Sequence, residues 1–73
     1  MALETTHRTT IFVNGERTES KARTLAELVA GRGFAEGQVA TAVNGTFVPR
    51  QARAATLLGE GDKVEIVAPR QGG

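Results

Sequence analysis

Two Asn-Gly dipeptides constrain the fold more than any other feature of the sequence. Asn14-Gly15 follows residues 10–13, which are β-branched or aromatic, and Asn44-Gly45 follows residues 38–43, which alternate in size. A two-residue type I′ turn needs a positive φ at both central positions, which Asn and Gly tolerate better than other residues. The sequence therefore predicts two β-hairpins.

The two strands of the first hairpin differ in polarity. In the outgoing strand Ile11 and Val13 alternate with Phe12, so we expect the two aliphatic residues in the core and Phe12 on the other face of the sheet. The return strand, residues 16–20, is polar and has little to bury. We place it at a sheet edge, where its charges also oppose pairing with the edge of another sheet.

A short helix is expected between the hairpins. Thr24 and Glu27 have the spacing of a capping box, which satisfies backbone donors at a helix N-terminus. Either Gly31 or Gly33 can adopt the left-handed conformation that ends a helix. The apolar residues between these signals form one stripe at i, i+3 and i+4: Leu25, Leu28 and Val29. We expect about two to three turns that pack on the sheet.

The second hairpin alternates between larger and smaller residues. Its first strand places Val39, Thr41 and Val43 on one face and the small Ala40 and Ala42 on the other.

The end of the chain carries a short helical segment and a final strand. Pro49 ends the second hairpin because proline cannot donate to a ladder, and the Ala-rich residues 50–58 predict a short helical or 3₁₀ turn. Residues 63–68 form the last strand, with Val64 facing the core and Pro69 ending the strand.

The order of these elements predicts an α+β fold. Two hairpins and one helix require a sheet with the helix on a single face, and the final strand fits the centre, parallel to the first. This is a β-grasp with a mixed sheet of order 2-1-5-3-4. A chain of 73 residues is one domain; we expect it to span residues 9–68, with a flexible extension at residues 1–8 and a flexible tail at residues 69–73.

Composition excludes several functional classes. The chain has no cysteine, so disulfides and thiol chemistry are excluded, and its lone His7 has no partners for a metal site or a triad. A net charge of +1 without a basic stripe argues against nucleic-acid binding. With neither a long apolar run nor a signal-peptide core, a soluble protein of the cytoplasm is expected.

No constellation of residues predicts an enzyme. Glu60 and Asp62 lie in a turn and are interpreted as solvated turn residues, and the neighbouring glycines do not form a phosphate-binding loop. The residues themselves indicate a small binding or carrier domain.

The last five residues, Pro-Arg-Gln-Gly-Gly, are the unusual part of the chain. Glycine has no Cβ and passes through gaps that other residues cannot enter. Five extended residues reach roughly 17 Å, enough to carry a terminal carboxylate into another protein's active site. Taken alone the tail is best interpreted as a frayed end, but the predicted fold presents it directly after a central strand.

Three apolar residues should project from the outer face of the sheet: Phe12, Ala42 and Val67. Single exposed apolar residues are normal on a protein surface. Three on adjacent strands could instead form a patch that marks a partner site near the root of the tail.

Several segments together resemble the ThiS sulfur carriers of thiamine biosynthesis. The resemblance covers residues 9–73, and it rests on residues 39–45 (Val-Ala-Thr-Ala-Val-Asn-Gly), 47–50 (Phe-Val-Pro-Arg), Leu58, 60–62 (Glu-Gly-Asp), 64–67 (Val-Glu-Ile-Val) and 71–73 (Gln-Gly-Gly). The chain departs from the family in its extension at residues 1–8. It also lacks the aromatic residue often found shortly after the Pro-Arg pair, where residues 52–55 stand.

The resemblance implies a ubiquitin-like β-grasp and a defined chemistry. A ThiF-type adenylating enzyme would activate the carboxylate of Gly73 with ATP, and a sulfur donor such as a cysteine desulfurase would convert it to a thiocarboxylate. The thiazole synthase ThiG would then take the sulfur. Gly72 would give clearance in the partner's active site, and Arg70 and Gln71 would line its channel, although Arg70 could equally be a solvated arginine. The resemblance implies no bound cofactor or metal.

Two related functions and one simpler function stay open. A molybdopterin-synthase small subunit usually carries a Pro-Pro-Val-Ser-like run before its Gly-Gly end, whereas this chain has Pro69-Arg70-Gln71, which favours the thiamine pathway. A ubiquitin-like modifier would instead be conjugated through Gly73 to a lysine. A β-grasp interaction module with a passive tail is the third alternative.

Overall fold

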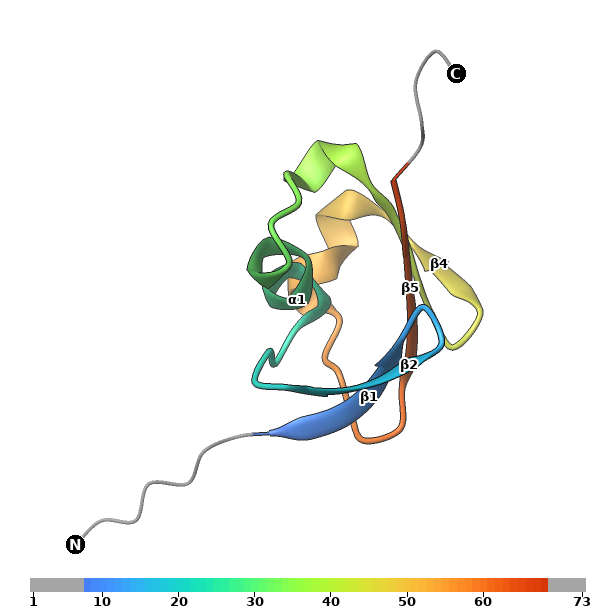
Figure 1. The fold of residues 1–73 in the computed structure, drawn as a ribbon. Helices are drawn as coiled ribbons and strands as arrows, with labels where there is room; N and C mark the ends of the chain where they lie inside the picture. Colours follow the sequence, from blue (N-terminus) through green and yellow to red (C-terminus); the bar gives the residue numbers. More distant parts are fainter. Residues whose placement is uncertain (1–7, 69–73) are drawn as a thin grey trace, which may run out of the picture.

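The computed structural model describes residues 8–68 of the chain. The expected extension and tail therefore lie almost entirely outside the described residues. Figure 1 shows five strands, one α-helix and two 3₁₀ helices along the chain. In order they are β1 (Thr9–Val13), β2 (Glu16–Ser20), α1 (Leu25–Gly31), the 3₁₀ helix η1 (Glu36–Gln38), β3 (Ala40–Val43), β4 (Thr46–Val48), the 3₁₀ helix η2 (Arg50–Ala55) and β5 (Lys63–Val67).

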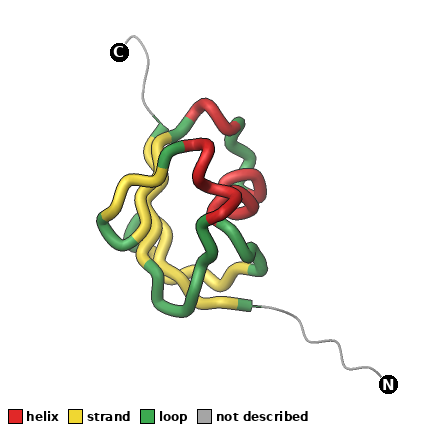
Figure 2. Tube along the Cα trace, turned by 180° about the vertical axis from the view of Figure 1, so that it is seen from behind, coloured by secondary structure: helices red, strands yellow, loops and turns green. Residues whose placement is uncertain are grey.

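The five strands form one mixed sheet of order β2-β1-β5-β3-β4. The central pair β1 and β5 is parallel, and the other neighbours are antiparallel. The helical segments gather on one side of the strands, as the view from behind shows clearly (Figure 2). The predicted β-grasp, its strand order and the edge position of β2 are confirmed.

Both hairpin turns have the predicted backbone. Asn14 and Gly15 have φ values of 52° and 86°, and Asn44 and Gly45 have φ values of 52° and 84°. Positive φ at both central residues is the type I′ signature, which matches the twist of the flanking strands.

The cap of α1 differs in one bond from the predicted capping box. The Thr24 hydroxyl accepts a hydrogen bond from the backbone N–H of Glu27 (3.1 Å), as expected. The Glu27 carboxylate, however, accepts from the N–H of Arg23 (2.7 Å), one residue before the cap. At the other end Gly31 stays within the helix, and Gly33 takes the positive φ, 85°.

The core lies between the sheet and the helical segments. It contains the aliphatic residues that the strand and helix periodicities predicted, and Val39, Val48 and Leu58 complete it. Its most deeply buried aliphatic side chains come from β1, β5 and α1: Ile11, Val64, Leu25 and Val29.

The third strand begins later than the sequence indicated. We expected extended backbone from residue 38, but β3 starts at Ala40, and Gln38 belongs to η1. The Gln38 side chain accepts from the backbone N–H of Ala35 (3.0 Å), and the Gln38 N–H donates to the Ala35 carbonyl (3.0 Å). These two local bonds favour a turn over a strand. Val39 follows it in an extended conformation and is buried.

The predicted short helical segment after Pro49 is the 3₁₀ helix η2, and it carries a buried arginine. Arg53 is only 3% exposed. Its Nε donates to the Thr41 hydroxyl (3.0 Å) and its Nη2 donates to the Val39 carbonyl (2.7 Å), while the Thr41 hydroxyl donates to the Val48 carbonyl (2.8 Å). Buried polar groups need such partners, and these bonds connect η2 to β3 and β4.

Within the part of the chain that the structure describes, no helix is long and apolar enough to cross a membrane.

Candidate partner-binding site

The central strand β5 leads the chain to the tail. It lies between β1 and β3, and its last residue, Val67, pairs with Ala40 of β3. The residues assigned to the tail site, Arg70, Gln71, Gly72 and Gly73, lie outside the described residues. Their roles stay predictions, and the structure describes only the platform from which they leave.

One side-chain amide fixes β5 just before that point. Backbone pairing between β1 and β5 reaches only as far as the bond from the Asn14 N–H to the Val64 carbonyl (2.8 Å). The Asn14 side chain then continues the ladder, because its Nδ2 donates to the Ile66 carbonyl (3.1 Å) and its Oδ1 accepts from the Ile66 N–H (2.9 Å). The amide thus takes the place of a backbone residue and holds β5 up to its penultimate position.

The second hairpin turn contacts the start of the same strand. Asn44 Oδ1 accepts from the Lys63 N–H (2.9 Å), and Asn44 Nδ2 donates to Asp62 Oδ1 (3.0 Å). The two asparagines that form the turns therefore also position β5 at both of its ends. The sequence indicated only their turn function.

Glu60 and Asp62 lie in or beside the turn, as interpreted, with Glu60 exposed and Asp62 half-buried, and their carboxylates also accept backbone hydrogen bonds. Asp62 Oδ2 accepts from the N–H of Gly59 (2.7 Å), in addition to its bond with Asn44. Glu60 Oε1 accepts from the N–H of Thr10 (3.3 Å). Because backbone donors in a tight turn need acceptors, these carboxylates serve as structural acceptors.

A shallow apolar hollow lies on the outer face of the sheet beside Val67. Its volume is about 120 Å³. Ala42 pairs across the strands with Phe47 of β4, and the small alanine leaves the ring uncovered. Phe47 is 65% exposed and Val67 is 58% exposed. The hollow is lined by Ala40, Thr41, Ala42, Phe47, Glu65 and Val67.

Phe12 lies away from this hollow. It is half-buried, pairs with Lys63 at the opposite end of β5, and lines a separate hollow of about 310 Å³. Glu65 borders both hollows. The structure therefore brings Ala42 and Val67 together, but it separates Phe12 from them by charged side chains.

Phe47 is the surface residue that the sequence interpretation missed. The available signal was strand alternation, because Val48 is buried and its neighbour must face outward. An exposed aromatic ring is an effective anchor for a protein partner. Phe47, Ala42 and Val67 are hereafter called the root patch.

Pro49 and Arg50 mark the change from β4 to η2. Pro49 is the N-cap of η2, and its carbonyl accepts from the N–H of Ala52 (2.9 Å). This pair thus directs the chain into the helix that carries Arg53. Within residues 8–68, no group of three or more His, Cys, Asp or Glu side chains is placed to hold a metal ion.

Comparison with known proteins identifies the family. The ThiS family model matches residues 5–73, nearly the whole chain. The chain belongs to the ThiS family. Its β-grasp, described above, is the ubiquitin-like fold that ThiS membership implies.

Solved structures of a ThiS protein superpose on this ThiS-family chain. The crystal structure of the thiamine biosynthesis protein ThiS from Geobacter metallireducens has a TM-score of 0.73 and 29% identity, covering 89% of this chain and 100% of that one. A solution structure of a thiamine biosynthesis protein from the same organism has a TM-score of 0.73 and 28% identity, covering 89% and 88%. A search of curated protein sequences found no significant match.

Proposed function

We propose that this chain is a cytoplasmic sulfur carrier whose Gly73 carboxylate is converted to a thiocarboxylate that supplies sulfur for the thiazole ring of thiamine. The observation that carries the proposal is the ThiS family match, which extends through Gly72 and Gly73. The central position of β5, immediately before the tail, supports it.

The proposed chemistry begins with activation. A carboxylate is a poor electrophile because its oxygen is a poor leaving group. In a ThiF-type partner, a carboxylate oxygen of Gly73 attacks the α-phosphorus of ATP, pyrophosphate leaves, and an acyl-adenylate forms. The terminal sulfur of a persulfide, carried by a donor such as a cysteine desulfurase, then attacks the acyl carbon and AMP leaves. A thiol reduces the S–S bond of the resulting acyl persulfide, is itself oxidised to a disulfide, and releases the thiocarboxylate. The resulting thiocarboxylate is the sulfur source for ThiG.

In this scheme the chain is a co-substrate rather than an enzyme. ATP is held by the adenylating partner, and the chain itself supplies the reactive carboxylate and a docking surface. Two glycines let the acyl carbon enter a narrow site because neither has a side chain. Arg70 and Gln71 contact the walls of the channel that leads to it.

We assign docking to the outer face of the sheet. The root patch, Phe47 with Ala42 and Val67, offers exposed apolar surface directly beside the strand end that leads to the tail. Phe12 forms a second contact at the other end of β5, next to Lys63. A partner that covers the root patch is well placed to receive the tail.

Deletion of Gly72 and Gly73 tests the proposal. The truncated protein should keep its thermal stability, because the deleted residues follow the last strand, but it should fail to restore growth to a thiamine-requiring strain that lacks its own ThiS. The full chain with Lys21→Ala serves as a control, since Lys21 follows β2, which is at the opposite edge of the sheet from β4 and Phe47. Full complementation by the truncated protein would exclude the carrier function.

Two further measurements separate the related functions. After incubation with the adenylating enzyme, ATP and a sulfur donor, the intact mass should show one oxygen replaced by one sulfur. Isopeptide-linked conjugates alone would instead identify a protein modifier. Rescue of a molybdenum-cofactor-deficient strain, without rescue of the thiamine-requiring strain, would identify the molybdopterin-type carrier.

A further inference from the structure

The free edge of the sheet at β2 presents backbone groups that can pair. In an antiparallel pair, residues alternate between those that bond to the partner strand and those that point away from it. The N–H of Phe12 donates to the Asp62 carbonyl (2.9 Å), and the Thr10 carbonyl accepts from Gly61 (2.7 Å), so these two residues of β1 bond away from β2. Their partners in β2, Arg17 and Glu19, therefore direct their own N–H and C=O groups outward from the sheet.

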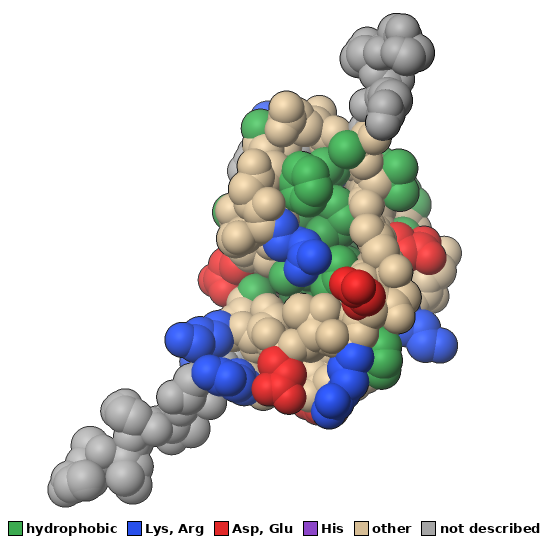
Figure 3. Space-filling model, viewed as in Figure 1, with side chains coloured by type: hydrophobic (Ala, Val, Ile, Leu, Met, Phe, Trp, Pro, Cys, Tyr) green, Lys and Arg blue, Asp and Glu red, His purple; other side chains and the backbone are tan. Residues whose placement is uncertain are grey.

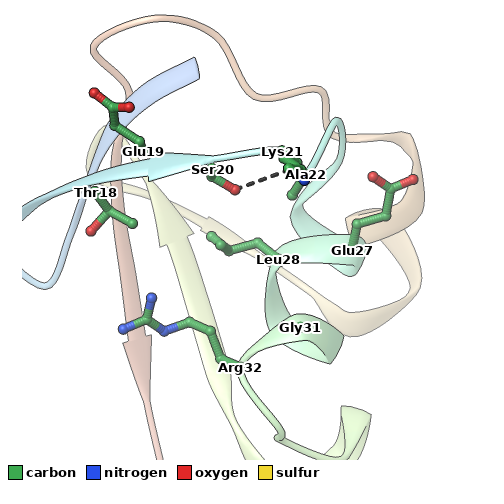
Figure 4. A pocket seen from close by; sticks show the side chains of 9 residues that line it. All are labelled: Thr18, Glu19, Ser20, Lys21, Ala22, Glu27, Leu28, Gly31 and Arg32. Atoms are coloured by element: carbon green, nitrogen blue, oxygen red, sulfur yellow. Dashed lines mark hydrogen bonds between the residues drawn. The ribbon is translucent and has the colours of Figure 1, made fainter. Parts of the chain in front are cut away.

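The same two residues carry opposite charges. Arg17 and Glu19 are both exposed, and alternation places their side chains on the outer face of the sheet. Figure 4 shows the side chains of Glu19 and Thr18 on opposite faces of the strand. Within residues 8–68 neither side chain makes a hydrogen bond or an ion pair.

We propose that two copies of this chain pair antiparallel through their β2 edges, about a two-fold axis at Thr18. In this register the outward backbone groups of Arg17 meet those of Glu19 in the second copy, and the reverse pair forms by symmetry. Each copy thus places a guanidinium opposite a carboxylate, and Thr18 lies opposite Thr18. Opposite-charge pairs and Thr–Thr pairs directly across strands are both favourable.

The charges also select this register. Charged residues on an edge strand usually oppose pairing. A shift of two residues sets Arg17 against Arg17 or Glu19 against Glu19, where like charges repel. A shift of one residue places the outward N–H and C=O groups of one copy opposite residues whose groups already bond to β1, so the hydrogen bonds between the copies cannot form. Among these registers, only the proposed one satisfies both hydrogen bonds and charges.

A groove beside the same edge leaves room for an added strand, and the charge pairing above identifies that strand as β2 of a second copy. The groove lies between β2 and α1, has a volume of about 470 Å³, and includes the apolar Leu28 and the side-chain-free Gly31. Figure 4 shows Leu28 and Arg32 pointing from α1 toward Thr18 of β2. Figure 3, which has the orientation of Figure 1, shows hydrophobic side chains exposed near the centre of this face of the molecule. A strand added at the β2 edge would lie along the open side of this groove.

The geometry of the pair follows from its symmetry. A two-fold axis through an antiparallel strand pair stands perpendicular to the sheet, so both α1 helices lie on one face of a continuous ten-stranded sheet. The interface is isologous, since the same surface is used by both copies. Because edge pairing buries little area, the dimer should be weak, as interfaces below about 1,200 Å² usually are.

Charge reversal at the edge tests the proposal. Sedimentation equilibrium of the full chain at concentrations up to about 1 mM, where weak interfaces become populated, should show a monomer–dimer equilibrium. Arg17→Glu or Glu19→Arg should each raise the dissociation constant by about tenfold or more, because each variant sets like charges opposite each other. The double variant Arg17→Glu/Glu19→Arg should dimerise like the natural chain, since its pairs again have opposite signs.

Mixing gives a second, stricter readout. The two single variants, each monomeric alone, should form a heterodimer when combined, because one carries two carboxylates and the other two guanidiniums at the edge. Arg23→Glu, an exposed charge reversal outside β2, is the matched control and should leave the dissociation constant unchanged. Circular dichroism checks that each variant is folded. A chain that stays monomeric at every concentration, or a dimer indifferent to both single reversals, overturns the proposal. The test does not depend on sulfur transfer.

Discussion

The two turn asparagines, Asn14 and Asn44, also form side-chain hydrogen bonds that stabilise the sheet. At Asn14 the backbone takes the positive φ that the hairpin needs, and the side chain occupies both hydrogen-bonding groups of Ile66. Asn44 combines a turn with bonds to Lys63 and Asp62 in the same way. Each residue thus joins a local turn to a strand that is distant in sequence.

Replacement of Asn14 by glycine should measure the amide separately from the turn. Glycine tolerates the positive φ, so Asn14→Gly should retain the hairpin but leave the two polar groups of Ile66 without their partner. We expect a loss of about 1–2 kcal/mol in the free energy of unfolding by urea, because two part-buried hydrogen bonds are lost and each has a net value of about 0.5–1.5 kcal/mol. Asn14→Asp, which keeps the acceptor and loses the donor, should fall between. Equal stability of Asn14→Gly and the natural chain would show that the amide contributes nothing.

Individual side chains divide into those that alternation predicted and those it did not. Ile11, Val13 and Phe12 lie on the expected faces because period-two alternation depends only on the strand itself. Arg53 was not predicted, because an arginine in an Ala-rich segment normally lies on the surface. Its burial depends on the Thr41 hydroxyl of β3 and on the carbonyl of Val39, just before β3, and both are distant from Arg53 in sequence.

Among the elements, α1 has the clearest sequence signals for its two ends, but its cap does not form all the bonds that these signals predict. Its N-terminus is capped by Thr24, whereas the carboxylate of Glu27 bonds to Arg23. Local bonds also decide where β3 begins. The two bonds between Gln38 and Ala35 stabilise η1, so β3 starts at residue 40 and not at residue 38.

The cap of α1 should contribute measurably to stability. Thr24→Ala removes the hydroxyl that accepts from the Glu27 N–H, and loss of such a cap typically costs about 1 kcal/mol. For a domain of this size that corresponds to a decrease of roughly 4–8 °C in Tm. Thr24→Ser keeps the hydroxyl, so its Tm should decrease by no more than about a quarter of that amount. If Ala and Ser melt together, the cap is not what stabilises this helix end.

At the scale of the whole molecule, the two faces of the sheet differ in what they contact. The inner face packs on α1 and the 3₁₀ helices to form the core, whereas the outer face carries the root patch and Phe12. Substitutions on the outer face should therefore affect partner binding more than folding.

Charge substitutions on the outer face should separate binding from stability. Phe47→Asp and Phe12→Asp should each lower the affinity for the adenylating enzyme, measured by titration calorimetry, with the larger loss at Phe47, because its ring is more exposed and lies beside Val67. Phe47→Asp should change the unfolding free energy by less than about 1 kcal/mol, as exposed substitutions usually do. Leu57→Asp, at an exposed apolar residue outside the sheet, is the control. Unchanged affinity in Phe47→Asp would exclude the root patch as the docking surface.

The sequence by itself determined the five strands, the main helix and the strand order of the sheet, but not the 3₁₀ helix η1. Turn chemistry, period-two alternation and helix capping are local properties, and they were sufficient to predict both hairpins, the helix, the central position of β5 and the edge position of β2. The resemblance of scattered segments to ThiS also came from the sequence, and the family match bears it out.

The tertiary structure alone decided which of these residues meet. It separated Phe12 from Ala42 and Val67, brought Phe47 beside Val67, buried Arg53, and turned Glu60 and Asp62 into structural acceptors. The physical reason is that a strand fixes which way its side chains face, whereas neighbours across strands depend on register. Register is set by pairing between segments that are distant along the chain.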